Sequence, residues 1–260
     1  MKFRARRSEE VCLSKDVVLI TGGSSDVGCA LIKNYDAQDR IFLAHYNQSS
    51  HKLETLRKEM KAEVIPLQAD FRKEEEVKRF IEAVKAKGIM PNKIVHLAGS
   101  PVSPVRFGDL NWSKADEEMN IQVKSIGKIF QAFLPAMKKE RKGKVVFMLS
   151  SVVVLPHPSE GWAYYSEYMI VKHALQGLMK SVISEYGKSG ININAVSPSM
   201  IDTNFLKNLP RRMVEIIGEQ HPMGRNATVA DVVPAIRYLL SPESDYLLGV
   251  NLAITGGLVI

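Results

Sequence analysis

Cysteine is scarce in this sequence: its 260 residues contain only Cys12 and Cys29. Two cysteines build neither a disulfide framework nor a zinc cluster, so we expect a protein that works in the reducing cytoplasm. The six histidines are scattered, without the spacing of metal ligands. We therefore expect no metal site.

Long apolar runs are also missing. Stretches such as VVLI and VVFML are far shorter than the roughly 20 residues of a membrane-spanning helix, so we expect no membrane segment. The opening MKFRARRSEE is basic and no apolar stretch follows it, unlike a secretory signal, so residues 1–13 are expected to be an irregular basic lead-in. The formal charge is +7, but no basic stretch is interleaved with aromatic residues. We therefore expect no nucleic-acid partner.

The sequence does contain short apolar runs that alternate with amphipathic stretches. Near-continuous apolar strands joined by helices predict a parallel sheet covered on both faces. No linker or internal repeat divides the chain, so we expect one doubly wound α/β domain of the Rossmann type over residues 14–260, with seven parallel strands and helices on both faces. The expected strands are 17–21, 40–45, 63–67, 93–97, 144–150, 191–196 and 247–254, and the expected helices include 27–35, 52–60, 73–87, 114–139 and 168–188.

Small and polar residues follow the expected strands, at the edge where a doubly wound sheet binds its ligands. The first strand runs into ITGGSSDVG, whose glycines allow a tight turn before a helix N-terminus that attracts phosphate. Asp70 follows the third strand, where it either accepts a hydrogen bond from an adenine amino group or caps the helix that begins near Lys73. Ala98 and Gly99 follow the fourth strand and leave room for a flat ring or a ribose.

Two more groups complete this edge. Ser150 and Ser151 follow the fifth strand, and Tyr168 and Lys172 lie four positions apart in YSEYMIVK. This spacing places the tyrosine and the lysine on one face of a helix, one turn apart. An ordinary helix surface also contains such pairs, so their meaning depends on the surrounding motifs.

Together these motifs resemble the short-chain dehydrogenase/reductase family in order and spacing, and they are most similar to its 3-oxoacyl-carrier-protein reductases. The resemblance runs from about residue 14 to the end of the sequence. It implies an NAD(P)-dependent oxidoreductase that transfers a hydride between a nicotinamide cofactor and a carbonyl or alcohol. The matching segments are TGGSSDVG, AD at 69–70, LAG at 97–99, SSVV at 150–153, YMIVK at 168–172, NAVSP at 194–198 and IDT at 201–203.

The resemblance implies catalytic roles for four residues. Tyr168 would donate a proton to the carbonyl oxygen, while the Lys172 ammonium would lower the pKa of this phenol and hold the nicotinamide ribose. Ser151, preferred to Ser150 because the SVV motif begins there, would bind the substrate oxygen. Gln122 stands where the family has an asparagine that assists a proton relay.

The resemblance also implies that a dinucleotide lies along the strand ends. Asp26 replaces a glycine of the family, and we expect it to cap the helix that begins near Val27. A left-handed backbone at this aspartate would cost about 1–2 kcal/mol. The expected cofactor-binding residues are Thr21, Gly22, Ser24, Ser25, Asp26, Val27, Gly28, Tyr46, Asn47, Asp70, Phe71, Ala98, Gly99, Tyr168, Lys172, Pro198, Ile201 and Thr203.

The end of the second strand reads AHYNQSS and lacks the acidic residue that would hold the 2′-hydroxyl of NAD. Tyr46 occupies that position, and His45, Asn47, Gln48 and Ser49 offer hydrogen-bond donors to a 2′-phosphate. We therefore favour NADP as the cofactor. NAD stays the alternative, because no arginine or lysine stands at the usual NADP positions.

Two segments are expected beside the substrate. One is the loop before Tyr168, which is longer than in the relatives, and the other is the segment 199–224, which forms a lid in the relatives. The lid combines apolar residues with cations, which suits a 3-oxoacyl chain on an acidic carrier protein, although a solvated amphipathic helix has the same pattern. The candidate substrate residues are Ser151, Trp162, Tyr164 and Phe205, with His157 as a further wall residue.

Three functions are therefore open. The first is an NADPH-dependent reductase of a 3-oxoacyl thioester or a similar ketone. The second is an NAD-dependent alcohol or sugar dehydrogenase. The third, suggested by Asp26 and Gln122, is a cofactor-binding scaffold with weak catalysis. The resemblance also implies a homo-oligomer, either a dimer or a tetramer.

Overall fold

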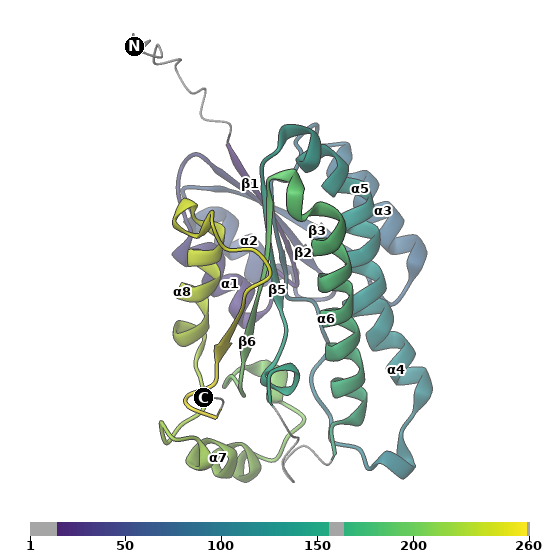
Figure 1. The fold of residues 1–260 in the computed structure, drawn as a ribbon, viewed down its shortest axis with the longest axis vertical. Coiled ribbons are helices and arrows are strands. Elements are labelled where there is room, and N and C mark those ends of the chain that lie inside the picture. Colours follow the sequence, from purple (N-terminus) through teal and green to yellow (C-terminus); the bar gives the residue numbers. More distant parts are fainter. Residues whose placement is uncertain (1–14, 156–163, 259–260) are drawn as a thin grey trace, which may run out of the picture.

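A seven-stranded parallel sheet forms the centre of the computed structural model, which describes residues 15–155 and 164–258 (Figure 1). The strand order is β3-β2-β1-β4-β5-β6-β7. The chain builds outward from β1 to β3 and then returns to place β4 on the other side of β1, which creates a switch point between β1 and β4. The strands are β1 (Asp16–Thr21), β2 (Arg40–Tyr46), β3 (Glu63–Gln68), β4 (Lys93–His96), β5 (Gly143–Met148), β6 (Ile191–Pro198) and β7 (Asn251–Ile254).

Helices cover both faces of this sheet, as Figure 1 shows. One layer contains α3, α5 and α6, and the other contains α1, α2 and α8. The predicted doubly wound α/β fold is confirmed. The helices are α1 (Asp26–Asn34), α2 (Ser50–Glu59), α3 (Glu74–Lys85), α4 (Trp112–Met119), α5 (Ser125–Glu140), α6 (Ser166–Tyr186), α7 (Arg211–Gln220) and α8 (Val229–Leu240).

Strand β1 illustrates why the apolar runs form this sheet. Its side chains alternate between the faces, so Val17 and Leu19 join the core under α3, α5 and α6. Val18 and Ile20 join the core under α1, α2 and α8. Because both faces are covered, the four consecutive positions from Val17 to Ile20 are all apolar and no polar alternation appears among them.

The long helix expected over residues 114–139 is interrupted in the structure. It consists of α4, a π-helical turn at Asn120–Lys124 and α5. The expected last strand at 247–254 is also shorter, because only Asn251–Ile254 pairs with β6. Residues 1–13 of the predicted lead-in lie outside the described residues, as do His157 and Trp162.

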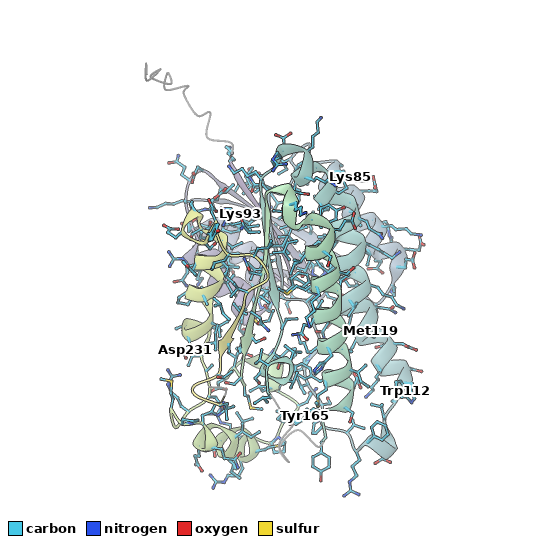
Figure 2. The ribbon with its side chains drawn as sticks, in the orientation of Figure 1. Lys85, Lys93, Trp112, Met119, Tyr165 and Asp231 are labelled. Atoms are coloured by element: carbon cyan, nitrogen blue, oxygen red, sulfur yellow. The ribbon has the colours of Figure 1, made fainter. Side chains whose placement is uncertain are left out.

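The strands of the sheet begin at one end of the molecule and finish at the other. Lys93 begins β4 at one end, whereas Tyr165 precedes α6 at the other (Figure 2). The carboxyl ends of the strands point toward the Tyr165 end, where α7 also lies (Figure 1). Ligand-binding residues are therefore expected at this end.

Candidate active site

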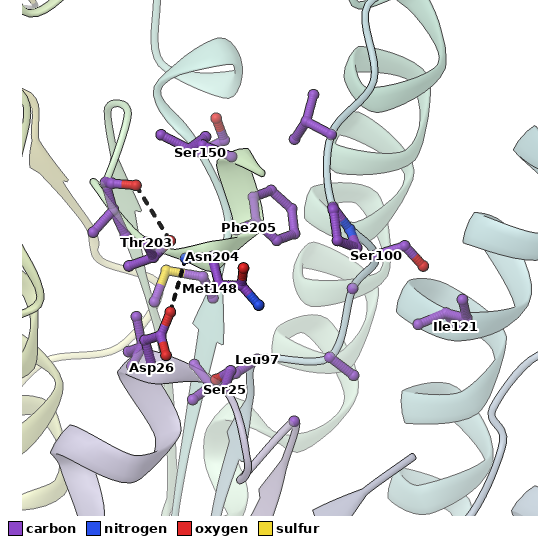
Figure 3. Close-up of a pocket in the computed structure, with 18 of the residues that line it drawn as sticks. Ser25, Asp26, Leu97, Ser100, Ile121, Met148, Ser150, Thr203, Asn204 and Phe205 are labelled. Atoms are coloured by element: carbon purple, nitrogen blue, oxygen red, sulfur yellow. Dashed lines mark hydrogen bonds between the residues drawn. The ribbon is translucent and has the colours of Figure 1, made fainter. Parts of the chain in front are cut away.

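A cavity of about 360 Å³ lies at the carboxyl ends of the strands. The turn after β1, the ends of β2, β4, β5 and β6, and the first turns of α6 all contribute to its wall. Figure 3 shows Ser25 and Asp26 on one side of it, facing Thr203, Asn204 and Phe205. The cavity thus occupies the switch point of the sheet.

The glycines of the turn after β1 are required by close backbone contacts. Gly22 has a φ of +70°, and a Cβ there would lie 2.9 Å from the carbonyl carbon of Leu97. A Cβ on Gly28 would lie 2.6 Å from the carbonyl oxygen of Gly23. Larger residues at these two positions would force β1, β4 and α1 apart.

Ser25, and not Asp26, caps α1. Its hydroxyl accepts a hydrogen bond from the Gly28 amide at 3.1 Å, so the predicted capping role of Asp26 is wrong. Among the described non-glycine residues only Arg141 has a positive φ, so Asp26 carries no left-handed strain. The first turn of α1 accommodates an aspartate because its backbone is already helical there.

Asp26 instead joins three segments that are distant in the sequence. Its carboxylate accepts a hydrogen bond from Lys52 Nζ at 2.9 Å and another from the Asn204 amide at 2.8 Å. Burial opposes its charge, but these hydrogen bonds prevail and lower the pKa of Asp26. The turn after β1 is thereby tied to α2 and to the segment after β6. Figure 3 shows the bond between Asp26 and Asn204.

His45 does not serve as a free donor at the end of β2. Its Nδ1 accepts a hydrogen bond from the Gly22 amide at 3.0 Å, and its Nε2 lies 3.0 Å from the Ala69 carbonyl, to which it therefore donates. Burial lowers its pKa to about 4, so the imidazole is neutral. It stacks on Phe71 with 3.8 Å between ring centroids. The prediction that His45 donates to a 2′-phosphate is wrong, because both of its nitrogens are already bonded.

Asp70 lines the cavity but does not cap a helix. Its carboxylate pairs with the Arg72 guanidinium at 2.7 Å, and this hydrogen bond lowers its pKa. The N-cap residue of α3 is Lys73 and not Asp70, so the capping alternative is wrong. The Asp70 carboxylate in the cavity wall is therefore fixed by its ion pair with Arg72, two positions further along the chain.

His96 links three elements behind the cavity. Its Nε2 lies 2.8 Å from the Gln122 carbonyl, which can only accept, so Nδ1 accepts from the Thr21 hydroxyl at 2.7 Å. Thr21 Oγ1 in turn accepts from the amides of Leu97 and Ala98 at 3.2 and 3.3 Å. Burial lowers the pKa of His96 to about 3, so this chain contains a neutral imidazole. Thr21 therefore supports the cavity from behind and does not line it.

The π-helical turn buries the side chain of Gln122. Its Nε2 donates to Glu118 Oε2 at 2.7 Å, while its Oε1 has no hydrogen-bond partner among the described residues. A Cβ on Gly99 would lie 3.4 Å from this amide group. The wider turn frees the Gln122 carbonyl for His96, as a π-turn at a functional site often does.

Tyr168 and Lys172 both line the cavity. Lys172 Nζ donates to the Met148 carbonyl at 2.9 Å and lies 5.6 Å from the centroid of the Tyr168 ring. Burial raises the pKa of Tyr168 to about 12, against the smaller effect of a hydrogen bond from Ser150, so the predicted lowering by Lys172 is wrong. Burial also lowers the pKa of Lys172 to about 8. The Tyr168 phenol is therefore protonated at neutral pH, next to a lysine whose ammonium form is weakened by burial.

The two serines after β5 differ in position. Ser150 lines the cavity and hydrogen-bonds Tyr168. Ser151, the residue that the motif favours, is fully buried, and its Oγ has no hydrogen-bond partner among the described residues. The extended backbone of Ser150 at the start of a short 3₁₀ turn, with φ of −163° and ψ of 159°, sends the second serine into the interior.

Most of the remaining predicted residues lie together. Gln122 and Tyr164 line an adjoining cavity, and Gly28 shapes the turn without lining either cavity. Lys52, Ser100 and Asn204 were missed, because no local pattern relates them to the strand ends. The predicted residues that line the main cavity are Gly22, Ser24, Ser25, Asp26, Val27, Tyr46, Asn47, Asp70, Phe71, Ala98, Gly99, Tyr168, Lys172, Pro198, Ile201, Thr203 and Phe205.

Residues 15–155 and 164–258 lack two further features. None of their helices is both long and apolar enough to cross a membrane. They also contain no group of three or more histidine, cysteine, aspartate or glutamate residues arranged to hold a metal ion.

Comparison with known proteins agrees with this geometry. The family model described as enoyl-(acyl carrier protein) reductase matches residues 26–259. The 3-oxoacyl-[acyl-carrier-protein] reductase FabG of Thermotoga maritima is 29% identical over 253 residues, which cover 95% of this chain and 99% of the relative. Nodulation protein G of Rhizobium sp. (strain N33) is 27% identical over 244 residues, which cover 93% and 96% of the two chains.

Solved structures show the same fold. A 3-oxoacyl-[acyl-carrier protein] reductase from Brucella melitensis superposes with a TM-score of 0.83 at 20% identity, covering 95% of this chain and 92% of that one. Levodione reductase superposes with a TM-score of 0.81 at 24% identity, covering 94% and 97%. The family model spans nearly the whole chain, and the cavity contains the tyrosine and lysine of the motif. The chain therefore belongs to the short-chain dehydrogenase/reductase family and is an oxidoreductase that acts on carbonyl or hydroxyl groups.

Proposed function

We propose that this protein reduces a ketone with NADPH and that Tyr168 is the proton donor. The observation that carries the proposal is the grouping of Tyr168, Ser150 and Lys172 on one wall of the cavity. When bound, the nicotinamide supplies the hydride. The residues described below bind the reactants, orient them and provide the proton.

Tyr168 suits proton donation to a developing alkoxide. Since its pKa is raised to about 12, the phenol carries its proton at neutral pH. An alkoxide is far more basic than a phenolate, so the transfer is downhill once hydride has reached the carbonyl carbon. The Ser150 hydroxyl has a single proton, which it donates to the phenol and can turn to the same substrate oxygen when a ketone is bound. We therefore assign to Ser150 the substrate-binding role that the motif suggested for Ser151.

Lys172 is proposed to hold the ribose next to the nicotinamide and to stabilise the phenolate left after proton transfer. Its ammonium lies 5.6 Å from the Tyr168 ring centroid and is anchored by the Met148 carbonyl. A cation at this distance favours the phenolate over the phenol. Its charge therefore stabilises the phenolate that remains once the proton has moved to the alkoxide.

The residues of the cavity fit a dinucleotide. The turn after β1 brings the N-terminus of α1 to the cavity wall, and the amide groups of that terminus attract a pyrophosphate. Lys52 supports NADP over NAD, because its ammonium lines the same cavity as Tyr46 and Asn47 at the end of β2. Its ion pair with Asp26 leaves two of its three N–H donors for a 2′-phosphate.

The substrate class is proposed from the relatives. The name of the Thermotoga maritima relative makes a 3-oxoacyl thioester, presented on a carrier protein, the first substrate to test. We also propose a homo-oligomer, dimer or tetramer, since Ile170 on α6 leaves 40% of its surface exposed. Light scattering during size-exclusion chromatography will determine its mass.

The proposal is tested by NADPH oxidation with a panel of ketones and 3-oxoacyl thioesters. Tyr168→Phe is expected to lower kcat at least a hundredfold while the Kd for NADPH changes less than threefold. Tyr186→Phe, at the opposite end of α6, is the matched control and keeps full activity. Equal turnover by Tyr168→Phe and the wild type would refute the role of the phenol.

A further inference from the structure

A second cavity of about 420 Å³ opens beside Tyr168. It lies between α4, α6 and the segment after β4, and it shares Tyr165, Tyr168 and residues 100–102 with the main cavity. Ser100, which lines both cavities, lies between Phe205 and Ile121 in Figure 3. A substrate whose carbonyl meets Tyr168 therefore has its remaining part within reach of this second cavity.

The inner wall of this second cavity is rich in hydrogen-bond acceptors. Gln122 is only 2% exposed and lines it, yet its Oε1 has no partner among the described residues. Glu118 and Glu167 are half-buried in the same wall. In the described part of the chain, neither carboxylate forms an ion pair within 4.0 Å, and Glu118 accepts only from the Gln122 side chain and, at 3.4 Å, the Ser100 amide. Buried acceptors of this kind require donors.

The carboxylates of the cavity repel one another, although Glu118 also favours the ammonium of Lys172, whose pKa it raises against the larger effect of burial. Burial raises the pKa of Glu167, and the nearby carboxylates of Glu118 and Glu117 raise it further, against a smaller effect of Lys114. Lys114 and Lys207 also line the cavity, but both are exposed and lie where water solvates them. A positive group between the inner carboxylates would relieve this repulsion.

Two tyrosines give the cavity an aromatic wall as well. Tyr164, which is 44% exposed, and the buried Tyr165 both line it. Carboxylates together with aromatic rings form the surroundings in which proteins bind ammonium groups. Acyl chains, in contrast, offer no donor to these acceptors.

We propose that the second cavity binds a protonated amine carried by the substrate, so that the protein reduces amino ketones, with Glu118 and Glu167 as the residues that determine this preference. The reduction itself rests on the proposed function, whereas the preference for an amine is a property of binding. The two are therefore measured separately.

The experiment uses three ketones that share one aromatic ring and one acetyl group. They are 4-(aminomethyl)acetophenone, 4-methylacetophenone and 4-acetylbenzoate, which are cationic, neutral and anionic at pH 7. Their binding to the full chain saturated with NADP⁺ is measured by calorimetry, so no turnover is needed. We expect the cationic ketone to bind at least tenfold more tightly than the neutral one and the anionic ketone to bind most weakly.

Three variants identify the cause. Glu167→Gln and Glu118→Gln are each expected to reduce the preference for the cationic ketone at least threefold. Glu63→Gln, at the far end of β3, removes the same charge outside the cavity and leaves the preference unchanged. Glu167→Gln keeps the proposal falsifiable if Glu118→Gln disturbs the Gln122 side chain, because Gln122 donates its hydrogen bond to Glu118 and not to Glu167.

The outcomes separate the two proposals. Equal or weaker binding of the cationic ketone, or a preference that survives in both cavity variants, overturns the amine proposal even if the neutral ketone is reduced. A carboxylate-dependent preference without NADPH oxidation on any ketone supports the amine proposal and refutes the reductase.

Discussion

The two halves of the site differ in how their buried polar groups are satisfied. On the cofactor side His45, His96 and Thr21 each have hydrogen-bond partners on neighbouring strands or turns. On the substrate side Gln122 Oε1 has no partner among the described residues, and Glu167 forms no ion pair there. A buried polar group that is fully bonded fixes a shape, whereas an unbonded acceptor in the wall of a cavity is available to a ligand. The comparison indicates a rigid cofactor half and a substrate half whose polar groups are completed on binding.

The largest effect is expected from a substitution that removes a buried hydrogen bond on the cofactor side. His96→Leu leaves the buried Gln122 carbonyl without its donor, so we expect the free energy of unfolding to fall by about 3 kcal/mol. His173→Leu is the matched control, since His173 is exposed and bonds only within its own helix. It should change stability by less than about 0.5 kcal/mol in the same urea titration. Similar losses for both variants would contradict the bridging role of His96.

The second prediction separates the two serines. Ser150→Ala removes a donor to the substrate oxygen, so we expect kcat/KM to fall about a hundredfold. Ser151→Ala removes a buried hydroxyl that does not line the cavity and should change kcat/KM less than about threefold. Steady-state kinetics on one ketone measures both. A larger loss of kcat/KM in Ser151→Ala than in Ser150→Ala would return the substrate-binding role to Ser151, as the motif suggested.

The third prediction concerns cofactor choice. Lys52→Met removes the ammonium at the end of β2, so the KM for NADPH should rise about tenfold while the KM for NADH stays within twofold. Lys58→Met, on the exposed part of the same helix, is the control and should change neither value. Parallel changes for both cofactors would show that Lys52 serves the turn after β1 and not the 2′-phosphate.

The smallest effect is a dependence of stability on pH. The Lys172 pKa is lowered from 10.5 to about 8 in the folded protein, so between these values the unfolded chain binds the additional proton. Stability therefore rises with pH in this window, by about 1 kcal/mol per pH unit. The difference in unfolding free energy between wild type and Lys172→Met should show this slope from pH 8.5 to 10.

Lys180→Met, which removes an exposed lysine from the same helix, provides the reference for that measurement. Its unfolding free energy should follow the wild type across the whole range. If the difference in unfolding free energy between the wild type and Lys172→Met does not change with pH, the pKa of Lys172 is not lowered by folding.

The sequence alone determined the architecture. Several strands contain an unbroken apolar run, as in residues 17–20, because both faces of the sheet are covered. The glycines of the turn, the Tyr168–Lys172 spacing and the absence of an acid at Tyr46 are local patterns, and they located most of the cavity wall. Local patterns are readable because their residues are neighbours along one helix or one turn.

Only the tertiary structure decided which groups meet across the chain. Asp26 bonds Lys52, 26 positions away, and Asn204, 178 positions away, and neither contact follows from a local pattern. The choice of Ser150 over Ser151 depends on how the short turn after β5 is directed, and the raised pKa of Tyr168 depends on burial by several segments. Burial and long-range hydrogen bonds are properties of packing, and packing exists only once the chain has folded.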